Sequence, residues 1–296
     1  MPPAFANAES HAARELIRLA LAEDLADRGD LTTAAVIPPS AAGSVSIVAR
    51  KPGVVSGLPI APLVFAEVDP RVRVELHAAD GDRVTKGTVV AVLTGATRSL
   101  LIGERTVLNF LTHLSGVATL TRKFVDLAEG TRAKILDTRK TYPGWRALQK
   151  YAVRCGGGVN HRMGLYDGVL IKDNHLAAWV GLDSRPSLRE AVAQARKVSP
   201  KDVTIEVEVD SLEQLRDVLK AHPDIVLLDN MSPATMSEAI AIRDREASDV
   251  QLEASGSVTL ETVAAIAATG VDRISIGALT HSAPALDLAF DWGALA

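Results

Sequence analysis

The sequence predicts an α/β protein, and three observations support this class. From Lys134 onward, short apolar strands alternate with amphipathic helical segments at intervals of about 20 to 35 residues, which is typical of βα units with parallel strands. The first third mixes helix with strands that are separated by turns. Hydrophobic residues make up 47% of the 296 residues and aromatic residues only 4%, a composition that indicates a packed α/β enzyme and excludes a disordered chain.

The elements of the first third can be placed from hydrophobic spacing and turn residues. A helix is expected from Ser10, which can cap it, to Leu21. Strands are expected at residues 44–49, 72–76 and 88–93, between turns at 52–53, 80–82 and 86–87. Residues 99–128 are then expected to form one or two helices, broken near Gly116.

Six further strands are expected in the remainder of the chain, at residues 135–136, 169–171, 204–209, 225–228, 250–252 and 273–276. Six strands, with room for one more, favour a barrel or partial barrel over an eight-stranded ring, and an open doubly wound sheet is the alternative. We expect an N-terminal α/β domain at residues 1–115, with the tail 283–296 packed on it, and a second α/β domain at residues 116–282.

Charge and cysteine content exclude several classes of protein. A net charge of −4 gives no excess of positive charge for binding nucleic acid or an anionic membrane. No apolar run approaches the roughly 18 residues of a membrane span, and the amino terminus lacks a signal pattern. Cys155 is the only cysteine, so an intrachain disulfide and a cysteine metal cage are excluded. A cytoplasmic protein is therefore expected.

Five potential cations lie on turns between residues 135 and 175: Arg139, Lys140, His161, Arg162 and Lys172. Each is next to an apolar strand or a glycine break. Ligands bind at the carboxyl ends of strands in α/β sheets and barrels. The cluster therefore fits a small molecule that carries several negative charges.

The later strands end in carboxylates or small residues. Glu206 and Glu208 point to the same face of one strand, and Glu208 is the better candidate because it is nearer the carboxyl end. With Asp229 at the next strand end, it could hold Mg²⁺ or stabilise a developing cation. The small turns Ser255-Gly256-Ser257 and Gly277-Ala278 let backbone N–H groups approach a phosphate. Together these groups fit a dicarboxylate, a sugar phosphate and a Mg²⁺-bound polyphosphate.

Each of these residues also has a purely structural interpretation. Asp137 and Asp229 are common turn residues, and Glu206 could pair with a buried lysine or arginine. Lys140 and Lys172 are, taken singly, ordinary exposed charges. The functional interpretation rests on the agreement of many strand ends.

Several motifs resemble the quinolinate phosphoribosyltransferase family. They lie at residues 103–106, 109–110, 114–116, 137–144, 157–162, 170–175, 206–209, 228–230 and 271–280. The sequence departs from the family pattern at His113, Tyr142, Trp145 and Ser257. The resemblance implies an N-terminal α/β domain with an open sheet, followed by an incomplete α/β barrel. It also implies Mg²⁺-dependent transfer of phosphoribosyl from phosphoribosyl pyrophosphate to quinolinate with decarboxylation, which gives nicotinate mononucleotide for NAD synthesis.

The resemblance implies a role for each matching residue. Quinolinate would be bound by Arg105, Thr138, Arg139, His161, Arg162 and Lys172. Lys140, Glu208 and Asp229 would be catalytic and would hold the ribose and the pyrophosphate, with Mg²⁺ on the two carboxylates and partly on the substrate. The rest of phosphoribosyl pyrophosphate would contact Ser255, Gly256, Ser257, Gly277, Ala278 and His281. A homodimer with shared active sites is expected, in which Arg105 comes from the other subunit.

Two alternatives remain at this point. One is a related phosphoribosyltransferase that acts on nicotinate or another planar acid, which would need fewer cations. The other is a carrier or interaction module, because residues 81–87 are similar to the turn of biotinyl or lipoyl carrier domains. No lysine stands in the usual hairpin setting of such a domain.

Overall fold

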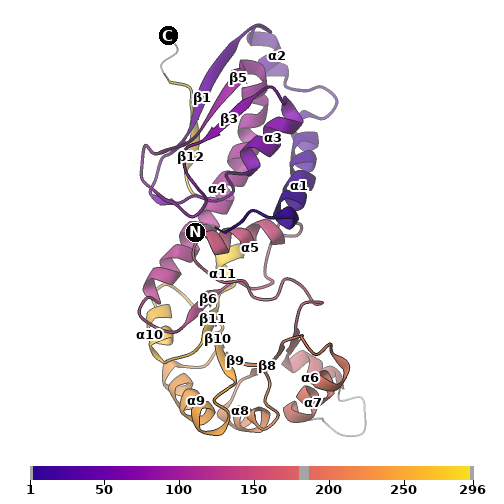
Figure 1. Cartoon of the computed structure of the whole chain (residues 1–296), viewed down its shortest axis with the longest axis vertical. Helices are drawn as coiled ribbons and strands as arrows, with labels where there is room; N and C mark the ends of the chain where they lie inside the picture. Colours follow the sequence, from indigo (N-terminus) through magenta and orange to yellow (C-terminus); the bar gives the residue numbers. More distant parts are fainter. Residues whose placement is uncertain (1–2, 180–186, 294–296) are drawn as a thin grey trace. The chain divides into compact units, whose positions relative to one another are not determined.

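The computed structural model describes residues 3–179 and 187–293, and these residues form two compact units (Figure 1). The first unit consists of residues 1–122, 140–157 and 278–296. The second consists of residues 123–139 and 158–277. Residues 294–296, part of the tail predicted at 283–296, lie outside the described residues, as do 1–2 and 180–186.

A four-stranded antiparallel sheet forms the centre of the first unit. Its order is β12 (Leu288–Asp291), β1 (Ala42–Ala49), β5 (Val89–Ala96), β3 (Arg73–Leu76). Figure 1 shows β12, in yellow, beside the early strand β1, and the register pairs Phe290 with Ile47. The strand from the chain's tail therefore completes the first sheet. A short pair, β2 (Gly53–Val54) and β4 (Arg83–Val84), stands apart from it.

The first unit also contains helices. They are α1 (Asn7–Leu25), α2 (Leu31–Val36), α3 (Ile60–Val68), α5 (Arg146–Cys155), α11 (Ala278–His281) and most of α4 (Thr97–Leu127). The expected break near Gly116 is wrong, because α4 is continuous through it. A Cβ atom on Gly116 would lie 2.9 Å from Cα of Ala285. Glycine is required there by the close approach of the tail, and not by a change of helix direction.

The second unit contains a six-stranded parallel sheet. Its order is β6 (Lys134–Leu136), β11 (Arg273–Ser275), β10 (Gln251–Ser255), β9 (Ile225–Asp229), β8 (Ile205–Val209), β7 (Val169–Ile171). The last strand thus lies beside the first, which is the order of a ring opened between β6 and β7. A doubly wound sheet would instead reverse its order at a switch point. Val159 forms a single parallel bridge with Leu136 at this opening. The predicted α/β class and the incomplete barrel are confirmed.

Five helices are assigned in the described part of the second unit: α6 (Asp173–Trp179), α7 (Leu188–Val198), α8 (Leu212–Leu219), α9 (Pro233–Glu246) and α10 (Val263–Ala268). Serine side chains cap three of them, at Ser187, Ser211 and Ser232. Ser211 and Ser232 closely follow strands β8 and β9, and each cap fixes where its helix begins. Within residues 3–179 and 187–293, no helix is long and apolar enough to cross a membrane.

Candidate active site

Asp137 fixes the loop that carries His161. It follows β6 and is fully buried. Its carboxylate accepts the backbone N–H of His161 over 2.9 Å and the side-chain amide of Asn160 over 2.6 Å. These bonds hold the 160–161 segment at the end of β6. Asp137 thus has a structural role, as one of the two sequence interpretations proposed.

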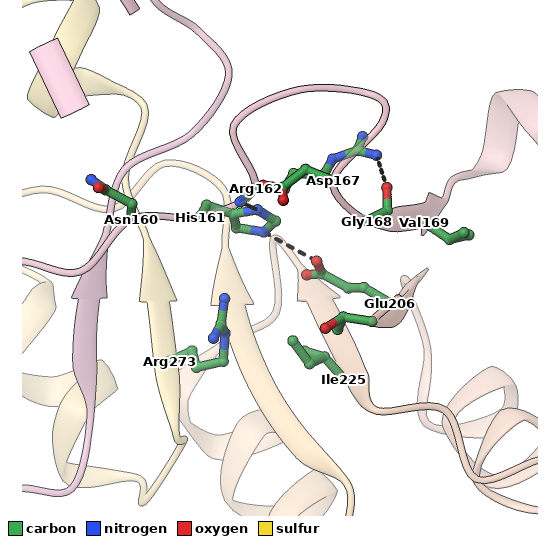
Figure 2. Close-up of a pocket in the computed structure, with 10 residues that line it drawn as sticks. Asn160, His161, Arg162, Asp167, Gly168, Val169, Glu206, Ile225 and Arg273 are labelled. Carbon is green, nitrogen blue, oxygen red and sulfur yellow. Dashed lines mark hydrogen bonds and ion pairs between the residues drawn. The ribbon is translucent and has the colours of Figure 1, made fainter. Parts of the chain in front are cut away.

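A buried cluster of charges lies against His161. The Nε2 atom of His161 is 3.1 Å from Oε2 of Glu206 and 3.4 Å from Oε1 of Glu253. Figure 2 shows the His161 ring directed at the Glu206 carboxylate. The Nε of Arg273 donates to Oε2 of Glu253 over 2.7 Å. The side chains of Glu206 and Glu253 are 3% and 0% exposed. Two carboxylates and two basic groups therefore occupy one enclosed volume.

The protonation of His161 is set by two opposing influences. Burial alone lowers its pKa, but Glu206 and Glu253 outweigh burial and raise the pKa to about 9. Against this, the N–H of Arg162 donates to Nδ1 over 2.8 Å, and protonation of Nδ1 breaks that bond. Burial and the charge of Glu253 raise the pKa of Glu206, whereas protonated His161 favours its ionised form. With both carboxylates ionised, Arg273 neutralises only one of them. An uncompensated buried charge costs about 3 kcal/mol or more, against about 1 kcal/mol for one hydrogen bond. We therefore take His161 as a cation at neutral pH.

A cavity of about 270 Å³ opens beside this cluster (Figure 2). Its lining includes His161, Arg162, Glu206 and Arg273. The guanidinium of Arg162 donates to the carbonyl of Gly168 over 2.6 Å. This volume is close to the lower limit of small-ligand pockets, about 300 Å³. Two carboxylates, those of Asp167 and Glu206, also line it, and its strand residues Val169, Ile225 and Arg273 are the first residues of their strands. The cavity therefore lies toward the amino ends of the strands, whereas Glu208 and Asp229 lie at or near the carboxyl ends.

Arg139 belongs to the same region. Burial lowers the pKa of Arg162, and the positive charge of Arg139 lowers it further. The two guanidinium groups are thus close enough to repel each other. An anion between them would relieve that repulsion and gain two charge-assisted contacts.

Lys172 and Glu208 form a second ionic pair. Lys172 follows β7, Glu208 lies near the end of the adjacent strand β8, and the Lys172 ammonium contacts Oε2 of Glu208. The backbone N–H of Lys172 donates to Nδ1 of His175 over 2.9 Å. Lys172 was predicted to bind quinolinate and Glu208 to bind the ribose and Mg²⁺. The structure therefore places these two side chains in contact.

The ends of β9 and β10 are joined by their loops. Asn230 donates its backbone N–H to the carbonyl of Ser255 and its amide to Asp229, each over 2.9 Å. Gly256 has φ +95°, and a Cβ there would meet the Asn230 side chain. Ser257 also has positive φ, at 49°. A strained, glycine-dependent turn thus follows β10 at the point where a phosphate was predicted.

Four predicted site residues belong to the first unit: Arg105, Lys140, Ala278 and His281. Arg105 is exposed on α4. The carbonyl of Lys140 accepts the hydroxyl of Thr280 over 2.8 Å. Thr138 follows Asp137 directly and is half-buried, and Gly277 follows β11 in the second unit.

Sequence reasoning missed Glu253 and Arg273. The register of the parallel strands β10 and β11 makes them direct neighbours. Glu253 stands between the buried apolar residues Leu252 and Ala254. A carboxylate between two apolar strand residues was the available signal, because a buried charge needs a partner.

Comparison with known proteins gives matches over nearly the whole chain. Residues 117–291 match the family model "Quinolinate phosphoribosyl transferase, C-terminal domain", and residues 30–115 match the corresponding N-terminal domain. Nicotinate-nucleotide pyrophosphorylase (carboxylating) of Mycobacterium leprae is 48% identical over 97% of this chain and 99% of its own length. Quinolinate phosphoribosyltransferase (decarboxylating) 2b of Nicotiana tabacum is 42% identical, over 93% and 80%. The solved nicotinate-nucleotide pyrophosphorylase of Francisella tularensis superposes with a TM-score of 0.87 at 38% identity, over 95% of this chain and 96% of that one.

Proposed function

The chain belongs to the quinolinate phosphoribosyltransferase family, and from this membership and the His161 cluster we propose how its residues carry out the reaction. The reaction transfers phosphoribosyl from phosphoribosyl pyrophosphate to the ring nitrogen of quinolinate. The carboxylate next to that nitrogen leaves as carbon dioxide, and the products are nicotinate mononucleotide and pyrophosphate.

Quinolinate binds through the basic groups Arg139, His161 and Arg162. The observation that carries this assignment is the mutual repulsion of Arg139 and Arg162, because two guanidinium groups this close favour an anion between them, and His161 directly precedes Arg162. Arginine binds carboxylates bidentately, so the two guanidinium groups suit the two carboxylates of the substrate. Thr138 and Lys172 complete the pocket, and Lys172 moves from Glu208 to the substrate on binding.

Lys140, Glu208 and Asp229 act at the phosphoribosyl pyrophosphate end. Glu208 and Asp229 end the paired strands β8 and β9 and are half-buried. Carboxylate oxygens are the ligands that Mg²⁺ prefers, so these side chains fit the ion. Bound Mg²⁺ would neutralise part of the pyrophosphate charge. The turn at Ser255, Gly256 and Ser257, with Gly277, Ala278 and His281, binds the remaining phosphate through N–H groups.

The chemistry then follows from charge. The pyridine nitrogen attacks C1 of the ribose as pyrophosphate leaves, with Lys140 offsetting the charge on the leaving group. Glu208 and Asp229 offset the positive charge that develops on the ribose. The ring nitrogen becomes positive and stabilises the electron pair that the breaking carbon–carboxylate bond leaves on the adjacent ring carbon, and that carbon then takes a proton.

The active site is shared between the subunits of a homodimer. Arg105 is exposed on α4 of the first unit and supplies a further carboxylate contact to the partner's pocket. Mixing the variants Arg105→Ala and Lys172→Ala then places both defects in one site of a heterodimer and leaves the other intact. Activity should recover toward half of wild type, and verified heterodimers without recovery would contradict a shared site.

The quinolinate assignment is tested by binding. Arg139→Ala or Arg162→Ala removes a charge-assisted contact worth roughly 1.5–3 kcal/mol, which corresponds to about a tenfold to hundredfold loss of quinolinate affinity. Calorimetry should show this loss for quinolinate and much less for phosphoribosyl pyrophosphate. Unchanged quinolinate affinity in both variants would refute the assignment.

A further inference from the structure

The amide of Gln149 is the centre of a buried hydrogen-bond network in the first unit. Gln149 lies in α5 and is fully buried. Its oxygen accepts the backbone N–H of Tyr142 over 2.9 Å, and its nitrogen donates to the carbonyl of Thr280 over 2.7 Å. The same nitrogen is 2.9 Å from Nε2 of His113 on α4. One side chain thus joins α4, α5, α11 and the loop before α5, with both amide hydrogens in use.

His113 is suited to accept from this amide. Burial lowers its pKa, so the ring is neutral, and its proton then resides on Nδ1 because Nε2 faces the Gln149 donor. The ring stacks on Tyr142 at 5.3 Å between centroids and meets the edge of Trp145 at 5.2 Å. Trp145 in turn stacks on Phe110 at 4.9 Å. His113, Tyr142 and Trp145, three of the four departures from the family pattern, are therefore in mutual contact.

The network reaches Lys140 from two sides. The hydroxyl of fully buried Thr280 donates to the carbonyl of Lys140 over 2.8 Å. Gln149 binds the N–H of Tyr142, two residues further along the chain. The two bonds restrain the backbone on either side of Thr141. The side chain of Lys140 itself is exposed.

We propose that Gln149 is a positioning residue which, through its bonds to Tyr142 and Thr280, fixes the backbone of the Lys140 loop for the reaction. The inference rests on the proposed role of Lys140 at the pyrophosphate end. Loss of an anchor would shift the ammonium without removing it, and misplacement of a reacting group by about 1 Å can cost on the order of a hundredfold in rate. The effect should fall on kcat and not on quinolinate binding.

Thr280→Val provides the sharpest test, because valine keeps the shape of threonine and removes only the hydroxyl. The matched control is Thr121→Val, since Thr121 is also fully buried and donates to a carbonyl, that of Val117, over 2.8 Å within α4. We expect kcat to fall on the order of tenfold in Thr280→Val, with unchanged quinolinate KM and with a melting temperature equal to the control. Equal kcat in the two variants would overturn the proposal.

Gln149→Leu and amide hydrogen exchange separate the possible failures. In this variant the Tyr142 amide should exchange faster and kcat should fall. Faster exchange with unchanged kcat overturns the positioning role and leaves the proposed function intact. If wild-type protein turns over quinolinate but Lys140→Ala is fully active, the proposed role of Lys140 is wrong, and the inference fails with it.

Discussion

Glu253→Gln should destabilise the protein strongly, because it removes one charge from the enclosed cluster around His161. Glu253 is 0% exposed and faces Arg273 at 2.7 Å and His161 at 3.4 Å. After the change, two basic groups face the single carboxylate of Glu206. Breaking a buried ion pair costs about 3–5 kcal/mol, and the 18% exposure of Arg273 places the expected loss near the lower value.

Urea denaturation at pH 7 measures this loss, with an unchanged slope required for a valid comparison. The control is Glu246→Gln, because Glu246 pairs with Arg216 at a similar 2.8 Å but the side chains are 31% and 49% exposed. Exposed pairs contribute less than about 1 kcal/mol. Burial, and not distance, should therefore separate the two variants. Losses below about 1 kcal/mol in both would refute the argument that the cluster is electrostatically enclosed.

Three further predictions concern single groups. Because the pKa of His161 is raised to about 9 from its ordinary 6.5, its contribution to stability is complete below pH 6.5 and disappears as the pH rises through 9. The free energy of unfolding should fall over this pH window in wild type and not in His161→Gln. Parallel curves for the two proteins would contradict the raised pKa. Gly256→Ala should cost more than about 1 kcal/mol and weaken phosphoribosyl pyrophosphate binding. Gly87→Ala is the control, because Gly87 has φ +90° and open space around the added Cβ, so that only backbone strain should lower its stability. Equal losses of stability in the two variants would exclude an overlap between the Cβ added at position 256 and Asn230. Burial raises the pKa of Cys155 to about 12, so a thiol reagent at pH 8 should modify it only after unfolding, and rapid native labelling would show that the thiol is accessible.

The fold was largely predictable because its signals are local. The alternation of apolar strands with amphipathic helices predicted the parallel sheet, although not the register of β10 with β9 and β11. Gly116 shows where local reasoning fails. Its missing side chain makes room for Ala285, 169 positions away along the chain, and such an approach leaves no trace near Gly116 in the sequence.

The proximity of candidate site residues was predictable where they follow strands, and less so where partners meet across strands. The cations at 139, 161 and 162 could be assigned to one region because each lies on a turn. The pairing of Glu253 with Arg273 depends on strand register, which the sequence does not display. The partner of Glu206 is likewise a matter of register and loop path, because Asp137 brings His161 to it from a separate segment.

The central claim is that this chain joins quinolinate to a phosphoribosyl group and removes one carboxylate. The direct measurement incubates the protein with phosphoribosyl pyrophosphate, Mg²⁺ and quinolinate labelled with ¹³C in the carboxylate next to the ring nitrogen. The expected result is nicotinate mononucleotide and labelled carbon dioxide in equal amounts, with no product when nicotinate replaces quinolinate. Efficient turnover of nicotinate, or a nucleotide product that keeps the label, would contradict the account.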